Sequence, residues 1–143
     1  MKVSECMTRE VEIVDPDTTL QNTARIMAEI DAGILPVSDG ERLIGIITDR
    51  DIAVRGVALG RSPDTRVGDV MSQEVLYCFE DQDVEDVLIN MGEIQVRRLP
   101  VLDRDKRLCG IVSLSDLAPG EEDEAGEALC EIARPSGLHS QAV

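Results

Sequence analysis

Apolar and polar positions follow the same order twice along the chain, and this order predicts two similar folding units. In each half, apolar residues recur at helical spacings of three and four, and short apolar stretches typical of strands lie on either side of them. The predicted buried helix faces carry Leu20, Ala24, Met27 and Ile30 in the first half, and Val84, Leu88, Met91 and Ile94 in the second. Each half therefore predicts the order strand, helix, strand, strand, helix.

The two halves also match residue by residue, which indicates an internal duplication. A shift of 64 residues places Val3-x-Glu5-x-Met7-Thr8 on Val67-x-Asp69-x-Met71-Ser72, and Leu35-Pro36-Val37 on Leu99-Pro100-Val101. After one inserted residue, a shift of 65 places Arg42-Leu43-x-Gly45-Ile46 on Arg107-Leu108-x-Gly110-Ile111, and Asp51 on Asp116. One unit of about 60 residues is only marginally stable alone. The predicted fold is therefore α/β (α+β), with two β-α-β-β-α repeats packed sheet to sheet about a pseudo-twofold axis.

The predicted boundaries follow the repeats. Residues 1–60 form the first repeat, 61–66 a linker, 67–118 the second repeat, and 119–143 an acidic helix and tail. The first strands are expected at 11–14 and 75–78, and Asp17 or Asp81 stands near the N-cap of the helix that follows. Pro119-Gly120 is expected to end or kink the last helix soon after Asp116.

The charge of the chain limits its partners. Its 29 Asp and Glu against 14 Lys and Arg give a net charge of −15 over 143 residues, and so acidic a surface repels nucleic acid and anionic lipid. Tyr77 and Phe79 are its only aromatic residues, so stacking platforms for single-stranded nucleic acid are missing. No apolar stretch reaches the roughly 18 residues of a membrane span, and the first residues lack the apolar core of a signal peptide. We expect a cytoplasmic protein that binds neither nucleic acid nor membrane.

The cysteines and the single histidine form no recognisable metal or catalytic pattern. Cys6, Cys78, Cys109 and Cys130 contain no C-x-x-C pair, and His139 lies in the tail. Neither repeat shows a nucleophile with its base, which argues against an enzyme and against an obligatory cofactor or metal. Reduced, mostly buried thiols are expected in a cytosolic chain. A redox role of Cys6 or Cys130 stays open.

Two matched polar pairs are the strongest candidates for binding residues. Thr48 stands three residues before Asp51 at a predicted strand-to-helix junction, and Ser113 stands three before Asp116. A hydroxyl there can cap the helix beside N–H groups that favour an anion, and the carboxylate can accept two hydroxyl hydrogen bonds. The same spacing fits a capping box that only stabilises the helix start. The residues alone leave both interpretations open.

The repeats resemble a tandem pair of cystathionine-β-synthase (CBS) domains, or Bateman module. The resemblance rests on two ordered copies of three segments, 3–8, 34–37 and 43–52 in the first and 67–72, 97–101 and 108–117 in the second. The layout is similar to small stand-alone bacterial CBS pairs, including those of the hypoxic response type. The resemblance implies binding of an adenine ligand (AMP, ADP, ATP, NAD or S-adenosylmethionine), with Thr48 or Ser113 at a phosphate and Asp51 or Asp116 at the ribose hydroxyls.

A bound phosphate also needs cations, and the two repeats supply them differently. Arg50 lies inside the first motif, whereas Arg97 and Arg98 precede the Leu-Pro-Val of the second. A guanidinium can hold a phosphate with two parallel hydrogen bonds, which makes these three residues the best candidates. The alternative for each is a solvated surface charge.

Two functions are compatible with these features. The first is a regulatory module that senses an adenine nucleotide (AMP, ATP or NAD) and changes its association with an unidentified protein partner. The alternative is a dimeric structural or interaction scaffold with degenerate nucleotide sites. A homodimer is expected because CBS pairs commonly form disk-like dimers through their helices. The helix after Asp51 also has more apolar surface than one core face needs, in Ile52, Ala53, Val54, Val57, Ala58 and Leu59.

Overall fold

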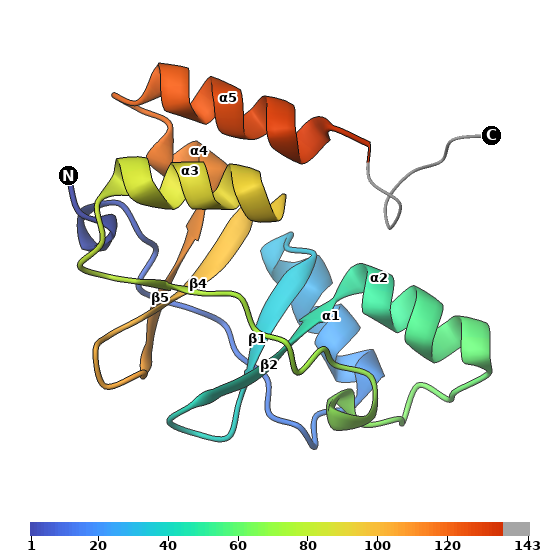
Figure 1. Ribbon diagram of the computed structural model, residues 1–143. Coiled ribbons are helices and arrows are strands. Elements are labelled where there is room, and N and C mark those ends of the chain that lie inside the picture. The colour runs from blue at the N-terminus through green and yellow to red at the C-terminus, as the bar shows by residue number, and fades with distance from the viewer. Residues whose placement is uncertain (136–143) are drawn as a thin grey trace. The chain divides into compact units, whose positions relative to one another are not determined.

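The two sequence repeats exchange their leading segments in the folded chain. A computed structural model describes residues 1–135 and divides into two compact units (Figure 1). Unit 1 combines Met1–Arg9 with Tyr77–Asp103 and the chain from Cys109 onward, and unit 2 combines Glu10–Leu76 with Arg104–Leu108. Each unit therefore holds the helices and main strands of one repeat and the opening segment of the other. The end of the predicted tail, residues 136–143, lies outside the described residues.

The core of unit 2 joins helix α1 (Leu20–Ile30) to the antiparallel strands β1 (Ile34–Ser38) and β2 (Leu43–Thr48). Thr19 caps α1, because its side chain accepts a hydrogen bond from the Asn22 backbone N–H at 3.1 Å. The buried apolar residues are Val14, Leu20, Met27, Leu35, Val37, Ile47, Val67 and Val70. The last two come from the opening segment of the second repeat, so this core needs residues from both repeats.

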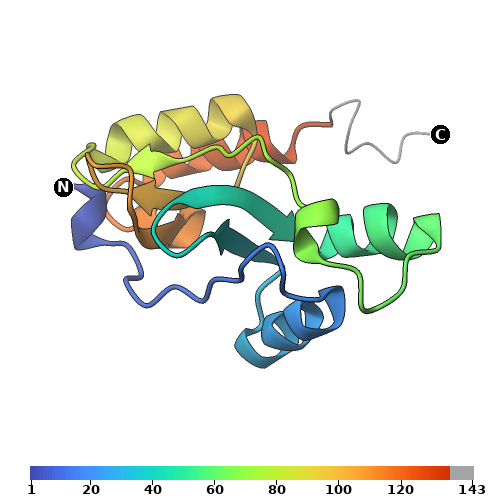
Figure 2. The ribbon, with the colours of Figure 1, turned by 90° about the horizontal axis from the view of Figure 1, so that it is seen from below.

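The helical segment after β2 changes its hydrogen-bond spacing along its length. Helix α2 (Asp49–Asp51) continues into a π turn at Ile52–Gly56 and a 3₁₀ turn at Val57–Leu59. A Cβ at Gly56 would lie 3.0 Å from Leu20 Cδ1, so the glycine lets this segment approach α1. Figure 2 shows the segment running outward from the end of β2.

Unit 1 holds a three-stranded sheet. Strand β3 (Cys78–Phe79) pairs in parallel with β4 (Arg98–Leu102), and β5 (Leu108–Ser113) is the other neighbour of β4. The buried core includes Val3 and Met7 from the opening segment of the first repeat. The mixture of helices with small sheets confirms the predicted α+β class.

Helices cover the sheet of unit 1. Helix α3 (Val84–Ile94) is the counterpart of α1, and the short α4 (Leu114–Leu117) is followed by α5 (Glu122–Ala133). Helices α3 and α5 lie side by side (Figures 1 and 2). A Cβ at Gly92 would lie 3.1 Å from Ala128 Cα, so small residues allow this close approach. The predicted break after α4 is present, since the chain leaves the helix before α5 begins.

The same backbone hydrogen bonds and the same methionine–glycine contact hold each opening segment in the unit that it joins. In unit 2, Ser72 and Ile46 exchange two backbone hydrogen bonds of 2.9 and 3.0 Å. Met71 lies over Gly45, where a Cβ would be 2.6 Å from its sulfur. Unit 1 repeats these contacts between Thr8 and Ile111 and between Met7 and Gly110. The glycines of the duplicated hairpins therefore make room for methionines from the duplicated opening segments.

The predicted core face of α1 is partly wrong. Ala24 and Ile30 are exposed, Ile30 by 42%, whereas the buried residues of the helix are Leu20, Thr23 and Met27. The Thr23 hydroxyl donates a hydrogen bond to the Thr19 carbonyl oxygen at 2.8 Å, which satisfies this polar group inside the core. The hydrogen bond therefore allows Thr23 to be buried on the face where the apolar pattern predicts Ala24.

The other predicted elements differ less from the structure. The face of α3 is confirmed, with Val84, Leu88 and Met91 buried and Ile94 packed at the edge of the core. The strand predicted at 11–14 is reduced to one bridge between Val14 and Val37, and the strand predicted at 75–78 is only Cys78–Phe79. The N-caps of α1 and α3 are Thr19 and Asp83, each two residues after the predicted aspartate.

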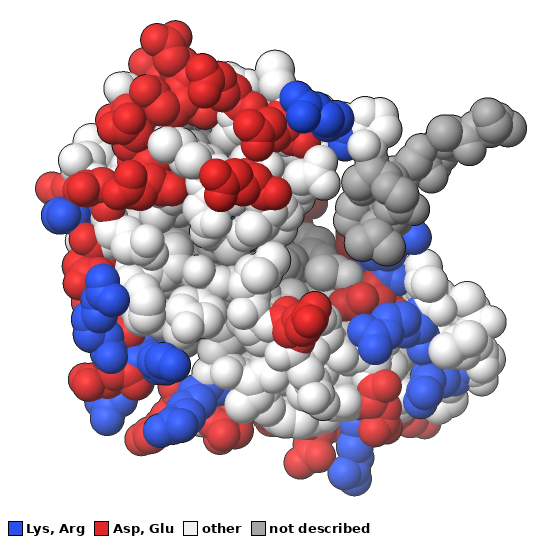
Figure 3. Space-filling view, in the orientation of Figure 1, with Lys and Arg blue, Asp and Glu red and all other residues white. Residues whose placement is uncertain are grey.

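Acidic side chains gather over α3 and α5 of unit 1 (Figure 3). The exposed members are Glu85, Asp86 and Glu93 on α3 and Glu122, Asp123 and Glu127 on α5. Such a face repels the phosphates of a nucleic acid. None of the helices in the described part of the chain combines the length and the apolar character that a membrane crossing requires.

Candidate functional site

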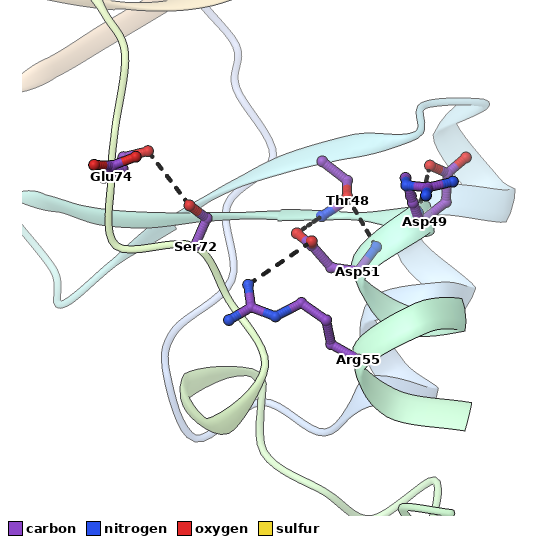
Figure 4. Close-up of polar contacts among 7 residues, drawn as sticks. Thr48, Asp49, Asp51, Arg55, Ser72 and Glu74 are labelled. Carbon is purple, nitrogen blue, oxygen red and sulfur yellow. Dashed lines mark hydrogen bonds and ion pairs between the residues drawn. The ribbon is translucent and has the colours of Figure 1, made fainter. Parts of the chain in front are cut away.

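Thr48 and Asp51 connect the end of β2 to the start of α2 through two reciprocal hydrogen bonds (Figure 4). The Asp51 backbone N–H donates to Thr48 Oγ1 at 3.0 Å, and the Thr48 backbone N–H donates to Asp51 Oδ2 at 3.0 Å. The pair forms a capping box, because each side chain accepts from the backbone of the other. This geometry fixes both side chains at the strand-to-helix junction.

Arg55 belongs to the same junction and was missed by the sequence analysis. Its Nη1 lies 4.0 Å from Asp51 Oδ1, the carboxylate oxygen that the capping box does not use (Figure 4). The Asp51 side chain is 18% exposed and that of Arg55 is 51% exposed. The spacing of four residues between a carboxylate and a guanidinium on one helix was the available signal.

A second carboxylate lies beside this junction. The Asp49 backbone N–H donates to the Gly33 carbonyl oxygen at 2.9 Å, and the Asp49 side chain lies against Gly33. The backbone N–H of Arg50 donates to Asp49 Oδ1 at 2.8 Å, while the Arg50 side chain is exposed. Within the described residues, the Arg50 guanidinium, which is predicted to bind the phosphate, contacts neither Thr48 nor Asp51.

Ser113 and Asp116 repeat the capping box in unit 1. The Ser113 backbone N–H donates to Asp116 Oδ2 at 3.0 Å, and the Asp116 backbone N–H donates to Ser113 Oγ at 3.2 Å. Ser113 Oγ also lies 2.8 Å from Ser115 Oγ, within hydrogen-bond distance. The structure therefore brings together both predicted hydroxyl–carboxylate pairs.

The two predicted cations of the second repeat lie beside the unit 1 junction. The Leu114 backbone N–H donates to the Arg97 carbonyl oxygen at 2.8 Å, and Arg98 begins β4. Both arginines are exposed, and neither forms an ion pair with any residue that the structure describes. Their guanidiniums therefore remain available for an anion.

The capping boxes leave binding capacity on both carboxylates. An ionised carboxylate has two oxygens with about four lone-pair sites, and the box uses one of these sites. The bond to the Thr48 or Ser113 backbone also holds the carboxylate in one orientation. An Asp fixed in this way can accept hydrogen bonds from the hydroxyls of a ligand, so capping and ligand binding are compatible.

Two of the thiols are poor nucleophiles. Burial raises the pKa of Cys78 to about 12. Burial, followed by the hydrogen bond from Cys109 Sγ to Glu80 Oε2 at 3.5 Å, raises the pKa of Cys109 to about 11. Both thiols are therefore protonated at neutral pH, and a thiol is far less nucleophilic than its thiolate. No three His, Cys, Asp or Glu side chains of the described chain lie close enough to hold a metal ion.

The duplicated α+β unit, with a Thr/Ser-x-x-Asp box at each strand-to-helix junction, defines a tandem module with two matched candidate sites. The sequence model of the CBS domain matches residues 3–56 and again 67–119. The chain belongs to the CBS domain family, which confirms the resemblance predicted from its repeats.

Relatives and solved structures are similar to almost the whole chain. CBS domain-containing protein YhcV of Bacillus subtilis is 40% identical over 132 residues, which cover 91% of this chain and 94% of that protein. The crystal structure of Hypoxic Response Protein I with two coordinated zinc ions is 35% identical, with a TM-score of 0.74, and covers 84% of this chain and 98% of that one. The crystal structure of CBSX2 in complex with AMP is 25% identical, with a TM-score of 0.73, and covers 85% and 96%.

Proposed function

We propose that this protein is a regulatory module that binds an adenine nucleotide of the AMP, ATP or NAD type and changes its association with a protein partner when the ligand binds. The observation that carries the proposal is the pair of matched junctions, Thr48 with Asp51 and Ser113 with Asp116, in a chain of the CBS family. The AMP complex of the structurally similar CBSX2 supports an adenine ligand.

The residues at each junction suit the parts of such a ligand. The carboxylates of Asp51 and Asp116 would accept hydrogen bonds from the two ribose hydroxyls, and the hydroxyls of Thr48 and Ser113 would contact the phosphate. Exposed arginines nearby, Arg50 in unit 2 and Arg97 and Arg98 in unit 1, would supply the positive charge. None of these roles needs a catalytic base, and the proposal includes no chemical reaction.

The alternative is a structural or interaction scaffold whose nucleotide sites are degenerate. The complete capping boxes favour it, because they give both hydroxyls and both carboxylates a purpose in the absence of any ligand. The exposed Arg97 and Arg98 favour the binding function, because they form no ion pair within the described chain.

The proposal includes a homodimer formed through the helical segment after β2. Val54, Val57 and Leu59 are 46%, 71% and 68% exposed, and they lie within six residues of one another on this segment. Adjacent exposed apolar side chains of this size are typical of interaction surfaces. A dimer would place two copies of every candidate site in one particle, where ligand binding could alter the surface offered to a partner.

Thermal unfolding with AMP, ATP, NAD and S-adenosylmethionine tests the binding function. A ligand at 100 times its dissociation constant should stabilise the folded chain by about 2.7 kcal/mol. Isothermal titration calorimetry then gives the number of sites and the affinity of each ligand that stabilises. The scaffold alternative expects no stabilisation by any adenine compound up to millimolar concentration.

A further inference from the structure

The two strand-to-helix junctions differ in charge at one matched pair of positions. In unit 2 the pair is Gly33 and Asp49, and in unit 1 the repeat places Arg97 and Leu114 there. The same backbone hydrogen bond joins each pair, from Asp49 N to the Gly33 oxygen at 2.9 Å and from Leu114 N to the Arg97 oxygen at 2.8 Å. The backbones of the two junctions therefore correspond. Of the two matched side chains, the charged one is a carboxylate in unit 2, from Asp49, and a guanidinium in unit 1, from Arg97.

Packing couples the two substitutions within each pair. A Cβ built at Gly33 would lie 2.8 Å from Asp49 Oδ2 and 3.2 Å from its Cγ, and the first distance is shorter than a Cβ approaches another atom. In its present orientation the Asp49 carboxylate thus occupies the space that a side chain at position 33 would need, and the exposed Asp49 side chain would have to turn to admit one. In unit 1, Leu114 packs against the apolar core instead, and position 97 carries an arginine. A junction with this backbone can hold the carboxylate or the arginine, but both together require a shift.

The remaining charges at the matched positions reinforce the difference. Unit 2 carries two carboxylates and two guanidiniums at these positions, those of Asp49, Asp51, Arg50 and Arg55, and Arg55 Nη1 lies 4.0 Å from Asp51 Oδ1. Unit 1 carries one carboxylate, Asp116, and two guanidiniums, those of Arg97 and Arg98, and the counterparts of Arg50 and Arg55 are Ser115 and Gly120. The unit 2 junction is therefore neutral in total, and the unit 1 junction carries one net positive charge.

We infer that the two candidate sites differ in their preference for a 5′ phosphate, and that Asp49 is the residue that sets the difference. Unit 1 favours a nucleotide with a charged 5′ phosphate over adenosine, whereas in unit 2 the Asp49 carboxylate opposes the charge that Arg50 supplies, so that this site does not prefer the phosphate. A phosphate held beside Thr48 would lie next to the Asp49 carboxylate, and this like-charge contact is unfavourable. A phosphate beside Ser113 would lie next to Arg97, with which it can form charge-assisted hydrogen bonds. The inference rests on the proposed ribose roles of Asp51 and Asp116.

Calorimetric titration with AMP and with adenosine tests the inference one site at a time. Asp116→Asn leaves the unit 2 site to be measured, and Asp51→Asn leaves the unit 1 site. The measured quantity is the ratio of the adenosine dissociation constant to the AMP dissociation constant. We expect a ratio of about ten or more for unit 1 and about one or less for unit 2.

Removing the Asp49 charge is the sharpest comparison. Asp49→Asn in the Asp116→Asn chain should shift the ratio toward AMP by about fivefold or more, because an isosteric amide no longer repels the phosphate. The double change Gly33→Arg with Asp49→Leu, which copies the unit 1 pair, should shift it further. Asp64→Asn removes the same charge from an exposed position after the helical segment and should leave the ratio unchanged.

The outcomes separate this inference from the proposed function. An unchanged ratio after Asp49→Asn, with adenosine still bound, would overturn the inference and leave nucleotide binding intact. Absence of binding of both compounds to the unmodified chain would refute the proposed function itself. If Asp116→Asn does not fold, the backbone amide signals of Asp51 and Asp116 in the unmodified chain report each site in one NMR titration. AMP should then move the Asp116 signal at a lower concentration than the Asp51 signal, and the reverse order contradicts the inference.

Discussion

Asp51→Asn separates the two roles that one carboxylate can have at the unit 2 junction. The asparagine keeps a carbonyl oxygen that can accept the Thr48 backbone N–H, which Asp51 Oδ2 accepts at 3.0 Å in the structure. It replaces the other oxygen with an NH₂ group, which cannot accept a hydrogen bond from a ribose hydroxyl. The substitution also removes the charge that faces Arg55 Nη1 at 4.0 Å.

The expected effects on stability and on affinity differ in size. Loss of a whole cap costs about 1 kcal/mol, and an ion pair with a spacing of four on a helix contributes about 0.3–0.5 kcal/mol. Because the cap is retained, the free energy of unfolding should fall by less than about 1 kcal/mol. Each hydrogen bond to a charged group contributes about 1.5–3 kcal/mol, so the dissociation constant of AMP or adenosine at this site should rise about tenfold or more.

Urea denaturation and calorimetric titration of the same samples measure both effects. Thr19→Ala is the matched control, because it removes one cap bond of the same kind, 3.1 Å long, from the start of α1. It should lower the free energy of unfolding by about 1 kcal/mol and leave the affinity of the folded protein unchanged. If Asp51→Asn destabilises the chain as Thr19→Ala does and binds AMP as tightly as the parent, the carboxylate is a cap only and its ribose role is refuted.

Three further predictions concern the surface, the thiols and the packing. Light scattering should give about twice the mass of 15.6 kDa for the parent and a monomer for Val57→Glu, and a monomeric parent contradicts the proposed interface. Iodoacetamide at pH 8 should label the exposed Cys130 of the folded chain and leave Cys78 unmodified, because a thiol with a pKa of about 12 holds almost no thiolate. Labelling of both cysteines at equal rates would contradict the burial of Cys78. Gly45→Ala places a Cβ 2.6 Å from the Met71 sulfur and 2.9 Å from the Ser72 backbone oxygen. It should lower the free energy of unfolding, measured with urea, by about 1–3 kcal/mol. Gly126→Ala, with open space around its position in α5, should leave this free energy unchanged or raise it.

The hairpin strands could be predicted because their signals are local. The hairpin strand expected at 43–47 is β2 (Leu43–Thr48), and that expected at 108–112 is β5 (Leu108–Ser113). Apolar stretches bounded by polar turns specify such strands without help from distant residues. The core face of α1 could not be predicted from apolar spacing, because the buried Thr23 depends on a hydrogen bond to the Thr19 carbonyl oxygen.

The candidate site also combines local features, which the sequence predicts, with contacts that depend on packing, which it does not predict. The three-residue spacing of Thr48 and Asp51 is a local pattern, and the structure contains the box that this pattern predicts. The contact between Gly33 and the Asp49 side chain joins residues on either side of a hairpin, so it depends on the register of β1 and β2. The exchange of opening segments likewise follows from packing, since each core contains buried residues of the other repeat, Val3 and Met7 in unit 1 and Val67 and Val70 in unit 2.

The duplicated boxes cannot distinguish a sensor from a scaffold, because both functions need a stable helix start. Charges that contribute nothing to the fold are more informative. Arg97 and Arg98 are adjacent, exposed and without an ion-pair partner among the residues described, although the chain has a net charge of −15 and carboxylates are abundant. An anion held at this junction would give an exposed guanidinium a charge-assisted partner. The position of Arg97 beside the Ser113–Asp116 box therefore supports the proposed binding of a phosphate-bearing ligand.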